Sequence, residues 1–329
     1  MTAEDGVVVV TGAAGFIGFH LSKRLVEMGY SVVGVDNLNP YYDVELKKAR
    51  LHILHAWDKF VFYRADLQDL SALQSIFTHH QVKWVCNLAA QAGVRHSLED
   101  PFSYEQANLA GFLNILELAR KHKIRNLVYA SSSSVYGKNK KSPYAVEDRV
   151  DHPISLYAAT KKANELMAHA YSHLFGIPCT GLRYFTVYGP WGRPDMALFL
   201  FTDAILNHRP IQVYNYGDMR RDFTYIDDII DGTVAALNRP VPYEIFNLGN
   251  SRSTGLLDFI GILEEELGAT AQKQMMPMQP GDVAETTADI EKSKACLEFS
   301  PRTPLREGIQ KFLSWYRKYY KIGDHGTDA

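Results

Sequence analysis

The stretch Val7-Val8-Val9-Val10-Thr11-Gly12-Ala13-Ala14-Gly15-Phe16-Ile17-Gly18 decides the fold. Its four valines predict a strand buried on both faces, and its glycines open a helix that runs to about Met28. Gly12 permits the tight turn, Gly15 lets the backbone approach phosphate oxygens, and Gly18 lets the helix pack closely on the strand. The helix N-terminus adds free N–H donors and positive potential. Because such turns also occur without a ligand, the motif alone leaves both a pyrophosphate site and a purely structural turn open.

The second predicted strand, residues 31–36, ends in an acid. Asp36 follows Gly12 at about the spacing expected for the carboxylate that binds the ribose hydroxyls of adenosine. The residues from Asn37 to Asn39 include no arginine that could neutralise a 2′-phosphate. The sequence therefore favours NAD over NADP as the cofactor.

Length and composition set the broad class of protein. The chain has 329 residues, 46% of them hydrophobic, which is enough for one α/β domain and a smaller appended domain. Its net charge is −2 with both signs interspersed, so we expect no nucleic acid and no membrane as partners. An acidic N-terminus and the lack of a long apolar run indicate a cytoplasmic protein.

The cysteines give no sign of metal or redox chemistry. Cys86, Cys179 and Cys296 are widely separated, and none belongs to a C-x-x-C pair. We therefore predict no metal site and expect all three to be buried, reduced thiols.

Strands and helices alternate through the first half of the chain. This alternation predicts a Rossmann fold of the α/β class, with a doubly wound parallel sheet and a smaller C-terminal α/β substrate-binding domain. Asp66 and Leu67 follow the third strand, 60–64, where an adenine would lie. Asp66 would equally serve as the cap of the helix that starts near Leu70, and both interpretations stay open.

Small and polar residues end the fourth strand, 83–90. Ala89 and Ala90 leave room for a flat ligand against the backbone. Gln91 and Arg95 bring polar groups to the same crevice at the carboxyl edge of the sheet.

Residues 131–137, Ser-Ser-Ser-Ser-Val-Tyr-Gly, follow the fifth strand, 126–130. A serine run is usually a flexible loop, but here it lies at the sheet edge where this fold binds its ligands. Tyr157 and Lys161 come later, four residues apart and thus on one face of a helix that runs to about Phe175. Many helices carry such a pair by chance. After the glycine turn, the acid-ended strand and the serine run, a catalytic role is favoured.

Together these motifs resemble the extended short-chain dehydrogenases that act on nucleotide sugars. Residues 183–197, Arg-Tyr-Phe-Thr-Val-Tyr-Gly-Pro-Trp-Gly-Arg-Pro-Asp-Met-Ala, are similar to the UDP-glucuronate 4-epimerases within that family, as are residues 221–228 and 280–283. The similarity extends over nearly the whole chain. It implies bound NAD and a UDP-sugar substrate, UDP-glucuronate or UDP-galacturonate.

The resemblance implies three catalytic residues. Tyr157 is the general base for the sugar 4-hydroxyl, and Lys161 together with the positive nicotinamide of NAD favours its phenolate. Lys161 also holds the nicotinamide ribose, and Ser132 hydrogen-bonds the same 4-oxygen. With the motifs above, the predicted cofactor contacts are Gly12, Gly15, Phe16, Ile17, Gly18, Asp36, Asn37, Asp66, Leu67, Ala89, Ala90, Gln91, Asn108, Tyr157, Lys161 and Tyr184. The predicted substrate contacts are Arg95, Ser132, Ser133, Ser134, Thr186, Arg193, Gln212, Arg221 and Asp282.

Arginines are expected to bind the charged groups of the substrate. In many relatives two arginines hold the diphosphate; Arg221 matches one, but Gln279 stands where the second is expected. Either Arg95 compensates or diphosphate binding is weaker. Arg193 is expected to bind the sugar carboxylate, and a surface pair with Asp195 is the alternative.

The residues beside Ser132 predict the type of reaction. Related dehydratases place Asp-Glu where this chain has Ser133-Ser134, and decarboxylating relatives place Glu at the second position. This chain therefore lacks the acid and base for elimination, and we expect a UDP-glucuronate 4-epimerase that oxidises the 4-position with NAD and returns the hydride after the keto sugar rotates. The alternatives are a 4-epimerase of UDP-glucose or an N-acetylated sugar, and a catalytically silent NAD-binding regulator.

The resemblance also predicts domains and assembly. A seven-stranded sheet completed by residues 244–248 is expected. The NAD-binding domain is expected in 1–185 and 222–250, and the nucleotide-sugar-binding domain in 186–221 and 251–329. A homodimer is implied, in which the helices 100–121 and 154–175 form a four-helix bundle through an apolar stripe with the candidates Leu109, Leu113, Leu166, Ala170 and Leu174.

Overall fold

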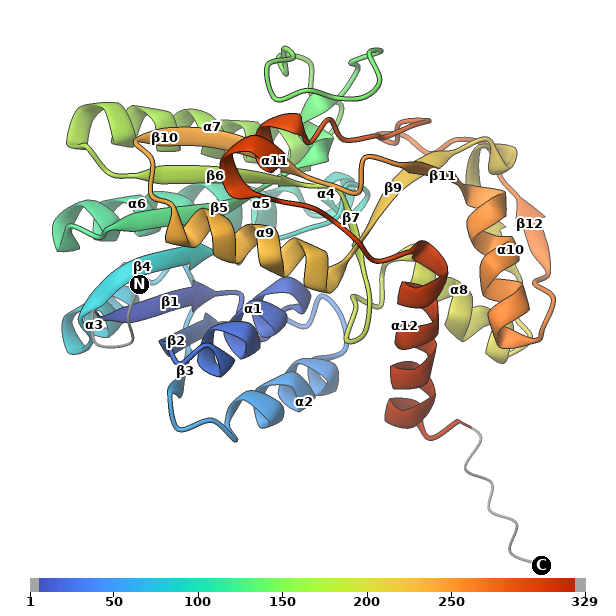
Figure 1. The fold of residues 1–329 in the computed structure, drawn as a ribbon, viewed down its shortest axis with the longest axis horizontal. Coiled ribbons are helices and arrows are strands. Elements are labelled where there is room, and N and C mark those ends of the chain that lie inside the picture. The colour runs from blue at the N-terminus through green and yellow to red at the C-terminus, as the bar shows by residue number, and fades with distance from the viewer. Residues whose placement is uncertain (1–5, 323–329) are drawn as a thin grey trace, which may run out of the picture.

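A computed structural model describes residues 6–322. Its main body is a seven-stranded parallel sheet in the order β10-β6-β5-β4-β1-β2-β3 (Figure 1). The strands are β1 (Val7–Thr11), β2 (Ser31–Asp36), β3 (Phe60–Arg64), β4 (Val82–Asn87), β5 (Asn126–Ser132), β6 (Cys179–Tyr184) and β10 (Tyr243–Leu248). The chain winds outward from β1 in both directions, so the predicted doubly wound Rossmann sheet is confirmed.

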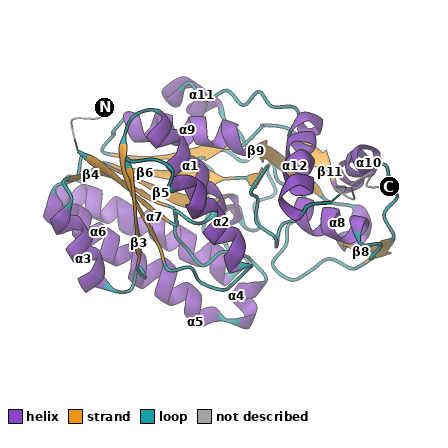
Figure 2. Ribbon diagram, turned by 90° about the horizontal axis from the view of Figure 1, so that it is seen from below, coloured by secondary structure: helices purple, strands orange, loops and turns teal. Residues whose placement is uncertain are grey.

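Helices cover both faces of this sheet (Figure 2). One face carries α1 (Phe16–Glu27), α2 (Val44–Leu54) and α9 (Ile226–Asn238), and the other carries α3 (Leu70–His79), α6 (Gly111–His122) and α7 (Leu156–Phe175). The valine run explains this arrangement, because alternate residues of a strand point to opposite faces. Val8 and Val10 join the core under α1 and α9, whereas Val9 joins the core under α3 and α6.

A smaller part of the molecule stands at the carboxyl edge of the sheet (Figure 1). A three-stranded sheet in the order β11-β9-β7 and a two-stranded sheet of β12 and β8 form it together with three helices. Its elements are β7 (Thr186–Tyr188), α8 (Ala197–Leu206), β8 (Ile211–Val213), β9 (Arg220–Tyr225), β11 (Ser253–Gly255), α10 (Leu256–Leu267), β12 (Lys273–Met275) and α12 (Leu305–Tyr320). Aromatic packing fills its core: Phe223 of β9 stacks on Phe259 of α10 at 4.4 Å.

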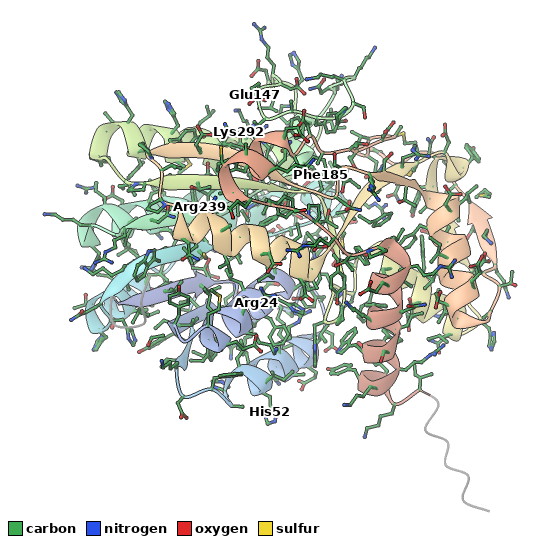
Figure 3. All side chains as sticks on the ribbon, viewed as in Figure 1. Arg24, His52, Glu147, Phe185, Arg239 and Lys292 are labelled. Atoms are coloured by element: carbon green, nitrogen blue, oxygen red, sulfur yellow. The ribbon has the colours of Figure 1, made fainter. Side chains whose placement is uncertain are left out.

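The chain passes between the two parts at positions that differ from the predicted domain boundaries. β9 spans the expected boundary between 221 and 222, and it pairs with β7 and β11 rather than with the large sheet. The helix α11 (Glu291–Leu297), expected in the smaller part, packs on β10 and α9. Its Lys292, labelled in Figure 3, forms an ion pair with Glu244 of β10. We keep the two-part division as a proposal with these two corrections.

The long helix predicted over 100–121 is interrupted. Two short helices, α4 (His96–Glu99) and α5 (Pro101–Tyr104), precede a π-helical turn over Glu105–Ala110, and α6 follows. In the π-helical turn, Asn108 is buried and hydrogen-bonds both backbone groups of Gln91, at 2.8 and 3.0 Å. Through Asn108, the π-helical turn therefore fixes the backbone of Gln91, which follows β4.

One part of the cysteine prediction is wrong. Cys86 in β4 and Cys179 in β6 are buried, but Cys296 is exposed on α11. Leu297, next to it, takes the inward position on this short helix. Among the described helices, none has the length and apolar content needed to cross a bilayer.

Candidate active site

A cavity of about 1090 Å³ lies at the carboxyl ends of the sheet strands and extends into the smaller part. Every residue predicted to contact cofactor or substrate lines it, apart from Asn108. The volume is at the upper end of the range for small-molecule sites, as expected for a cavity that takes a dinucleotide and a second ligand. Residues far apart in the sequence, from Gly12 to Thr286, thus line one cavity.

The sequence predicts that Asn108 contacts the cofactor, but Asn108 does not line the cavity. It lies behind the cavity wall, where its side-chain amide donates to the carbonyl of Gln91 and to the Thr160 hydroxyl, both at 3.0 Å. The predicted inner position of Asn108 on a helix is correct. The sequence did not indicate that the π-helical turn would direct the Asn108 side chain to the backbone of Gln91. Asn108 is therefore a support for Gln91 rather than a ligand contact.

The glycine turn forms the phosphate end of the cavity. Gly12 has a φ of +71°, in the left-handed region, and a Cβ at Gly18 would lie 2.0 Å from the Gly12 carbonyl oxygen. Gly15, the N-cap of α1, offers no side-chain hydrogen bond to the first turn. The N–H groups of that turn are left for a ligand, so this end of the cavity fits a pyrophosphate.

The acidic side chains after β2 and β3 form the nucleoside end. Asp36 is buried, and its carboxylate accepts from the N–H groups of Ala14, at 3.2 Å, and Leu38, at 2.8 Å. Asp66 accepts from the side-chain amide of Asn37 at 2.8 Å. These contacts join the glycine turn to the ends of both strands, and the acids fit the ribose of NAD.

Asp66 is not a helix cap. The residue that caps α3 is Asp69, whose carboxylate accepts from the N–H of Ala72 at 2.9 Å. The cap interpretation of Asp66 is therefore wrong, and its side chain is available at the cavity wall.

Ser132, Tyr157 and Lys161 meet at the centre of the cavity. Ser132 ends β5, and the other two lie one turn apart near the start of α7, which Ser155 caps through the N–H of Ala158 at 3.1 Å. The Ser132 hydroxyl lies beside the Tyr157 hydroxyl and favours its ionised form. The predicted grouping of the three side chains is thus present.

The ionisation of these groups depends on burial. Burial raises the pKa of Tyr157, although the Ser132 hydrogen bond and the Arg193 charge lower it. Burial also lowers the pKa of Lys161 to about 8, and its ammonium donates to the Ala130 carbonyl at 2.9 Å. In the chain by itself the phenol is neutral at pH 7, so the effect expected of Lys161 alone does not ionise it.

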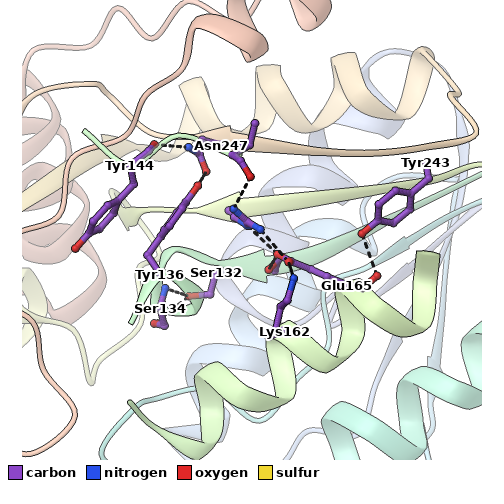
Figure 4. Close-up of polar contacts among 11 residues, drawn as sticks. Ser132, Ser134, Tyr136, Tyr144, Lys162, Glu165, Tyr243 and Asn247 are labelled. Atoms are coloured by element: carbon purple, nitrogen blue, oxygen red, sulfur yellow. Dashed lines mark hydrogen bonds and ion pairs between the residues drawn. The ribbon is translucent and has the colours of Figure 1, made fainter. Parts of the chain in front are cut away.

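A buried ion pair lies behind the serine strand (Figure 4). Glu165 of α7 accepts from Arg183 of β6 at 2.8 and 2.9 Å and from the Ser131 hydroxyl at 2.7 Å. These contacts fix the end of β5 against the helix that carries Tyr157. The sequence contained two signals that were missed: Glu165 continues the four-residue spacing of Tyr157 and Lys161, and a lone arginine in a buried strand needs a partner.

The sugar end of the cavity carries hydroxyls and one ion pair. Ser132 donates to the Ser134 hydroxyl at 3.1 Å (Figure 4). Ser133 and Thr186 also line the cavity. Arg193 contacts Asp195 at two points, 3.0 and 2.5 Å. The pair predicted as an alternative does form, but it lies in the cavity wall and not on the surface.

Both partners of this pair keep their charge. Burial lowers the pKa of Arg193, but the Asp195 carboxylate offsets this and the net pKa is raised. Burial raises the pKa of Asp195, but Arg193 outweighs it and the net pKa is lowered. Tyr41, which the sequence analysis missed, donates to Asp195 at 3.1 Å. A guanidinium is thus fixed in the cavity with further donor capacity.

A second group of cations lies at the far end of the cavity. Arg95 lies 4.6 Å from the ring centre of Tyr214 and 3.5 Å from the Asp282 carboxylate. Arg221 and Gln212 line the same end. Gln279 does not line the cavity, and its side-chain oxygen is buried with no hydrogen-bond partner. This placement favours the alternative in which Arg95 compensates for the missing arginine.

Residues 8–249 match the NAD dependent epimerase/dehydratase family. The match covers most of the chain, and the protein belongs to this family. The fold, the glycine turn and the grouping of Ser132, Tyr157 and Lys161 agree with that assignment.

Particular relatives narrow the comparison. UDP-glucuronate 4-epimerase 4 of Arabidopsis thaliana is 45% identical over 347 residues, covering 100% of this chain and 79% of the relative. The UDP-glucuronic acid 4-epimerase of Bacillus cereus, in complex with UDP-glucuronic acid and NAD, is 37% identical, with a TM-score of 0.89 over 95% of this chain and 100% of that one. The UDP-glucose 4-epimerase of Thermotoga maritima with UDP-glucose is 31% identical, with a TM-score of 0.88 over 95% and 99%.

Substitution of Gly18 by alanine tests the phosphate end. The new Cβ needs space that the Gly12 carbonyl occupies, so the turn must shift, and overpacking of about 1–3 kcal/mol predicts NAD binding weakened about tenfold or more. Gly261→Ala in α10 is the matched control, because no atom lies within 4 Å of its Cβ position. Calorimetric titration with NAD checks both variants. Equal affinities would contradict the assignment of the turn.

Proposed function

We propose that this chain is an NAD-dependent UDP-glucuronate 4-epimerase. The observation that carries the proposal is Arg193, a fixed guanidinium at the sugar end of a cavity that also contains Ser132, Tyr157 and Lys161. The relatives that carry this name and match nearly the full chain support the same substrate.

The cavity fits NAD through the uncapped first turn of α1, the carboxylate of Asp36 and the unpaired, buried side-chain nitrogen of Gln91. When bound, NAD supplies a hydride acceptor at the sugar C4 and later returns the hydride to the opposite face. The positive charge of the oxidised nicotinamide supplies the help that Tyr157 needs to ionise.

Tyr157 acts as the general base for the 4-hydroxyl. Tyr157 and Ser132 both line the cavity, so a sugar 4-oxygen placed between them can pass its proton to Tyr157 and accept a hydrogen bond from Ser132. Lys161 contributes a cation one helical turn away. The same residues return the proton to the oxygen after the sugar has turned.

The diphosphate stays bound while the sugar turns. Arg221 and Arg95 provide two cations at that end of the cavity, and Asp282 orients Arg95. Gln212 lies on β8 beside them and contacts the uridine ribose in this proposal. Fixing the diphosphate leaves rotation about its link to the sugar as the remaining motion.

The carboxylate is held by hydroxyls and by Arg193. The 4-keto uronate is a β-keto acid, which loses carbon dioxide when the carboxylate bond aligns with the carbonyl π system. Ser133, Ser134, Thr186 and Arg193 can hold the carboxylate out of that alignment by hydrogen bonds from the cavity wall. The absence of an acid at 133 and 134 removes the groups that elimination requires.

A neutral-sugar 4-epimerase is the second candidate. The Thermotoga maritima enzyme shows that the same fold accompanies UDP-glucose, so the fold does not distinguish the two substrates. Arg193 does, because its N–H groups that are not paired with Asp195 would gain a carboxylate partner from a uronate but none from a neutral sugar. The third candidate, a silent NAD-binding regulator, is disfavoured because Tyr157 and Lys161 are both retained and grouped with Ser132.

We also propose a homodimer formed by α6 and α7. These helices pack side by side on one face of the sheet (Figure 2) and leave leucines on their outer side. The exposed fractions of Leu113, Leu166 and Leu174 are 42, 60 and 67%, respectively. Ala170 is exposed between the latter two, and Leu109 is half-buried. Pairing two copies of this face would bury the leucines in a four-helix bundle.

Tyr157→Phe tests the proposed base. The change removes the hydroxyl and little volume, so turnover of UDP-glucuronate should fall by about 10²–10⁴-fold while NAD stays bound. A coupled assay for UDP-galacturonate and the absorbance of extracted NAD give the two quantities. Activity within tenfold of the wild type would be incompatible with this role.

Arg193→Ala tests the substrate. A charge-assisted contact of about 1.5–3 kcal/mol predicts that kcat/KM for UDP-glucuronate falls about tenfold or more, and decarboxylated products should appear. Arg239→Ala, which removes a partly exposed arginine paired with Glu298 outside the cavity lining, is the control and should leave the kinetics unchanged. Unchanged kinetics and products for Arg193→Ala would favour the neutral-sugar epimerase.

Sedimentation at micromolar concentration tests the dimer. The chain should sediment with twice its mass of 37.2 kDa, and Leu166→Glu with Leu174→Glu should reduce it to a single chain because charges oppose burial of that face. A wild-type protein that sediments as one chain would overturn this part of the proposal.

A further inference from the structure

The loop that carries Arg193 is held by side chains of the cofactor-binding part. Three consecutive carbonyls of this loop accept hydrogen bonds. His20 of α1 contacts the Pro190 oxygen at 2.9 Å. Arg50 of α2 donates to the oxygens of Trp191, at 2.6 Å, and Gly192, at 3.1 Å. The backbone immediately before Arg193 is therefore fixed from outside the loop.

Arg50 joins this loop to the glycine turn. Its other terminal nitrogen donates to the Ala14 carbonyl and to the Tyr42 hydroxyl, both at 2.8 Å. Its side chain is fully buried, and among the described contacts its partners are three carbonyls and a hydroxyl, with no carboxylate. Burial of a cation without an anion is costly, so a role beyond local stability is indicated.

Trp191 shows that the loop conformation is enforced. Its φ is +60°, in the left-handed region that a bulky side chain disfavours. Its ring packs against Phe19, Trp315 and Tyr319, with centroid distances of 5.7, 5.1 and 5.2 Å. This packing and the Arg50 hydrogen bonds together maintain a backbone that the loop would not adopt by itself.

We propose that Arg50, assisted by His20, is a positioning residue for recognition of the substrate carboxylate. Arg50 fixes the backbone at Trp191 and Gly192, and Asp195 and Tyr41 fix the side chain of Arg193. The guanidinium is then ordered before substrate arrives, which reduces the entropy lost on binding. The inference rests on the proposed function, because it assumes that Arg193 binds a uronate.

Titration of the NAD-saturated enzyme with UDP-glucuronate and with UDP tests the proposal. It separates an effect of Arg50 on the position of Arg193 from an effect on the stability of the whole protein. UDP lacks the sugar, so the ratio of the two affinities measures the contribution of the sugar and its carboxylate. Arg50→Met should lower this ratio about tenfold, the scale of one charge-assisted contact, while UDP affinity stays within about twofold. Arg50→Lys should restore part of the ratio, since an ammonium can still donate to a carbonyl. A purely structural Arg50 would weaken both ligands equally.

A double-mutant cycle with Arg193→Ala completes the test. If Arg50 acts through Arg193, Arg50→Met should change the ratio little once Arg193 is absent. His20→Phe keeps the ring packing on Phe16 and Phe19 but removes the contact with Pro190, and should lower the ratio about threefold, as for one neutral hydrogen bond. It serves as the readout if Arg50→Met does not fold.

Two outcomes would overturn the inference. Additive effects of Arg50→Met and Arg193→Ala would show that Arg50 does not act through Arg193, and an unchanged ratio in both Arg50→Met and His20→Phe would show no positioning at all. If the wild type neither turns over UDP-glucuronate nor binds it more tightly than UDP, the proposed function itself fails. Wild-type turnover with an unchanged ratio in the variants rejects only the role of Arg50.

Discussion

The close approach of Gly18 to the carbonyl of Gly12 is the constraint on which the rest of the structure depends. It sets how α1 leaves β1, and with it the position of the first-turn N–H groups at the edge of the sheet. The same turn presents the Ala14 N–H to Asp36 and the Ala14 carbonyl to Arg50. One short segment therefore fixes the phosphate end, the ribose end and, through Arg50, the loop at the sugar end.

Two buried arginines, Arg183 and Arg50, and the partly exposed Arg193 are stabilised in three different ways. Arg183 has a carboxylate partner, Glu165, and serves to join β6 to α7. Arg193 has Asp195 but keeps donors for a ligand. Among its described contacts, Arg50 has three backbone carbonyls and the Tyr42 hydroxyl, and no carboxylate. The permanent charge of arginine suits all three positions, because a lysine at the same depth would lose its proton more readily.

Tyr157 and Lys161 differ from these arginines, because the charge of each depends on its surroundings. Burial raises the pKa of Tyr157 and lowers that of Lys161 to about 8, so at pH 7 the phenol is neutral while the lysine still carries its charge. A positive cofactor charge beside Tyr157 reverses the balance for the phenol. In the proposed mechanism, deprotonation is thereby tied to the presence of the oxidised cofactor.

The sequence by itself determined the features that depend on neighbours a few residues apart. The glycine turn, the acid at the end of β2 and the shared helix face of Tyr157 and Lys161 all follow from local spacing, because strand and helix geometry fix where such residues point. The parallel, doubly wound sheet followed from the alternation of strands with helices. With the family resemblance, this was enough to predict contacts of which all but Asn108 line the cavity, although many further residues line it as well.

Only the tertiary structure decided features that depend on contacts between distant segments. The π-helical turn moved Asn108 from the cavity to the backbone of Gln91, and the packing of β9 beside β7 shifted the domain boundary. Arg50 lies on a helix with no sequence signal of its role, and three of its four partners are backbone carbonyls, which every residue has. Side-chain patterns report periodicity along one element, whereas hydrogen bonds to a distant backbone leave no such pattern.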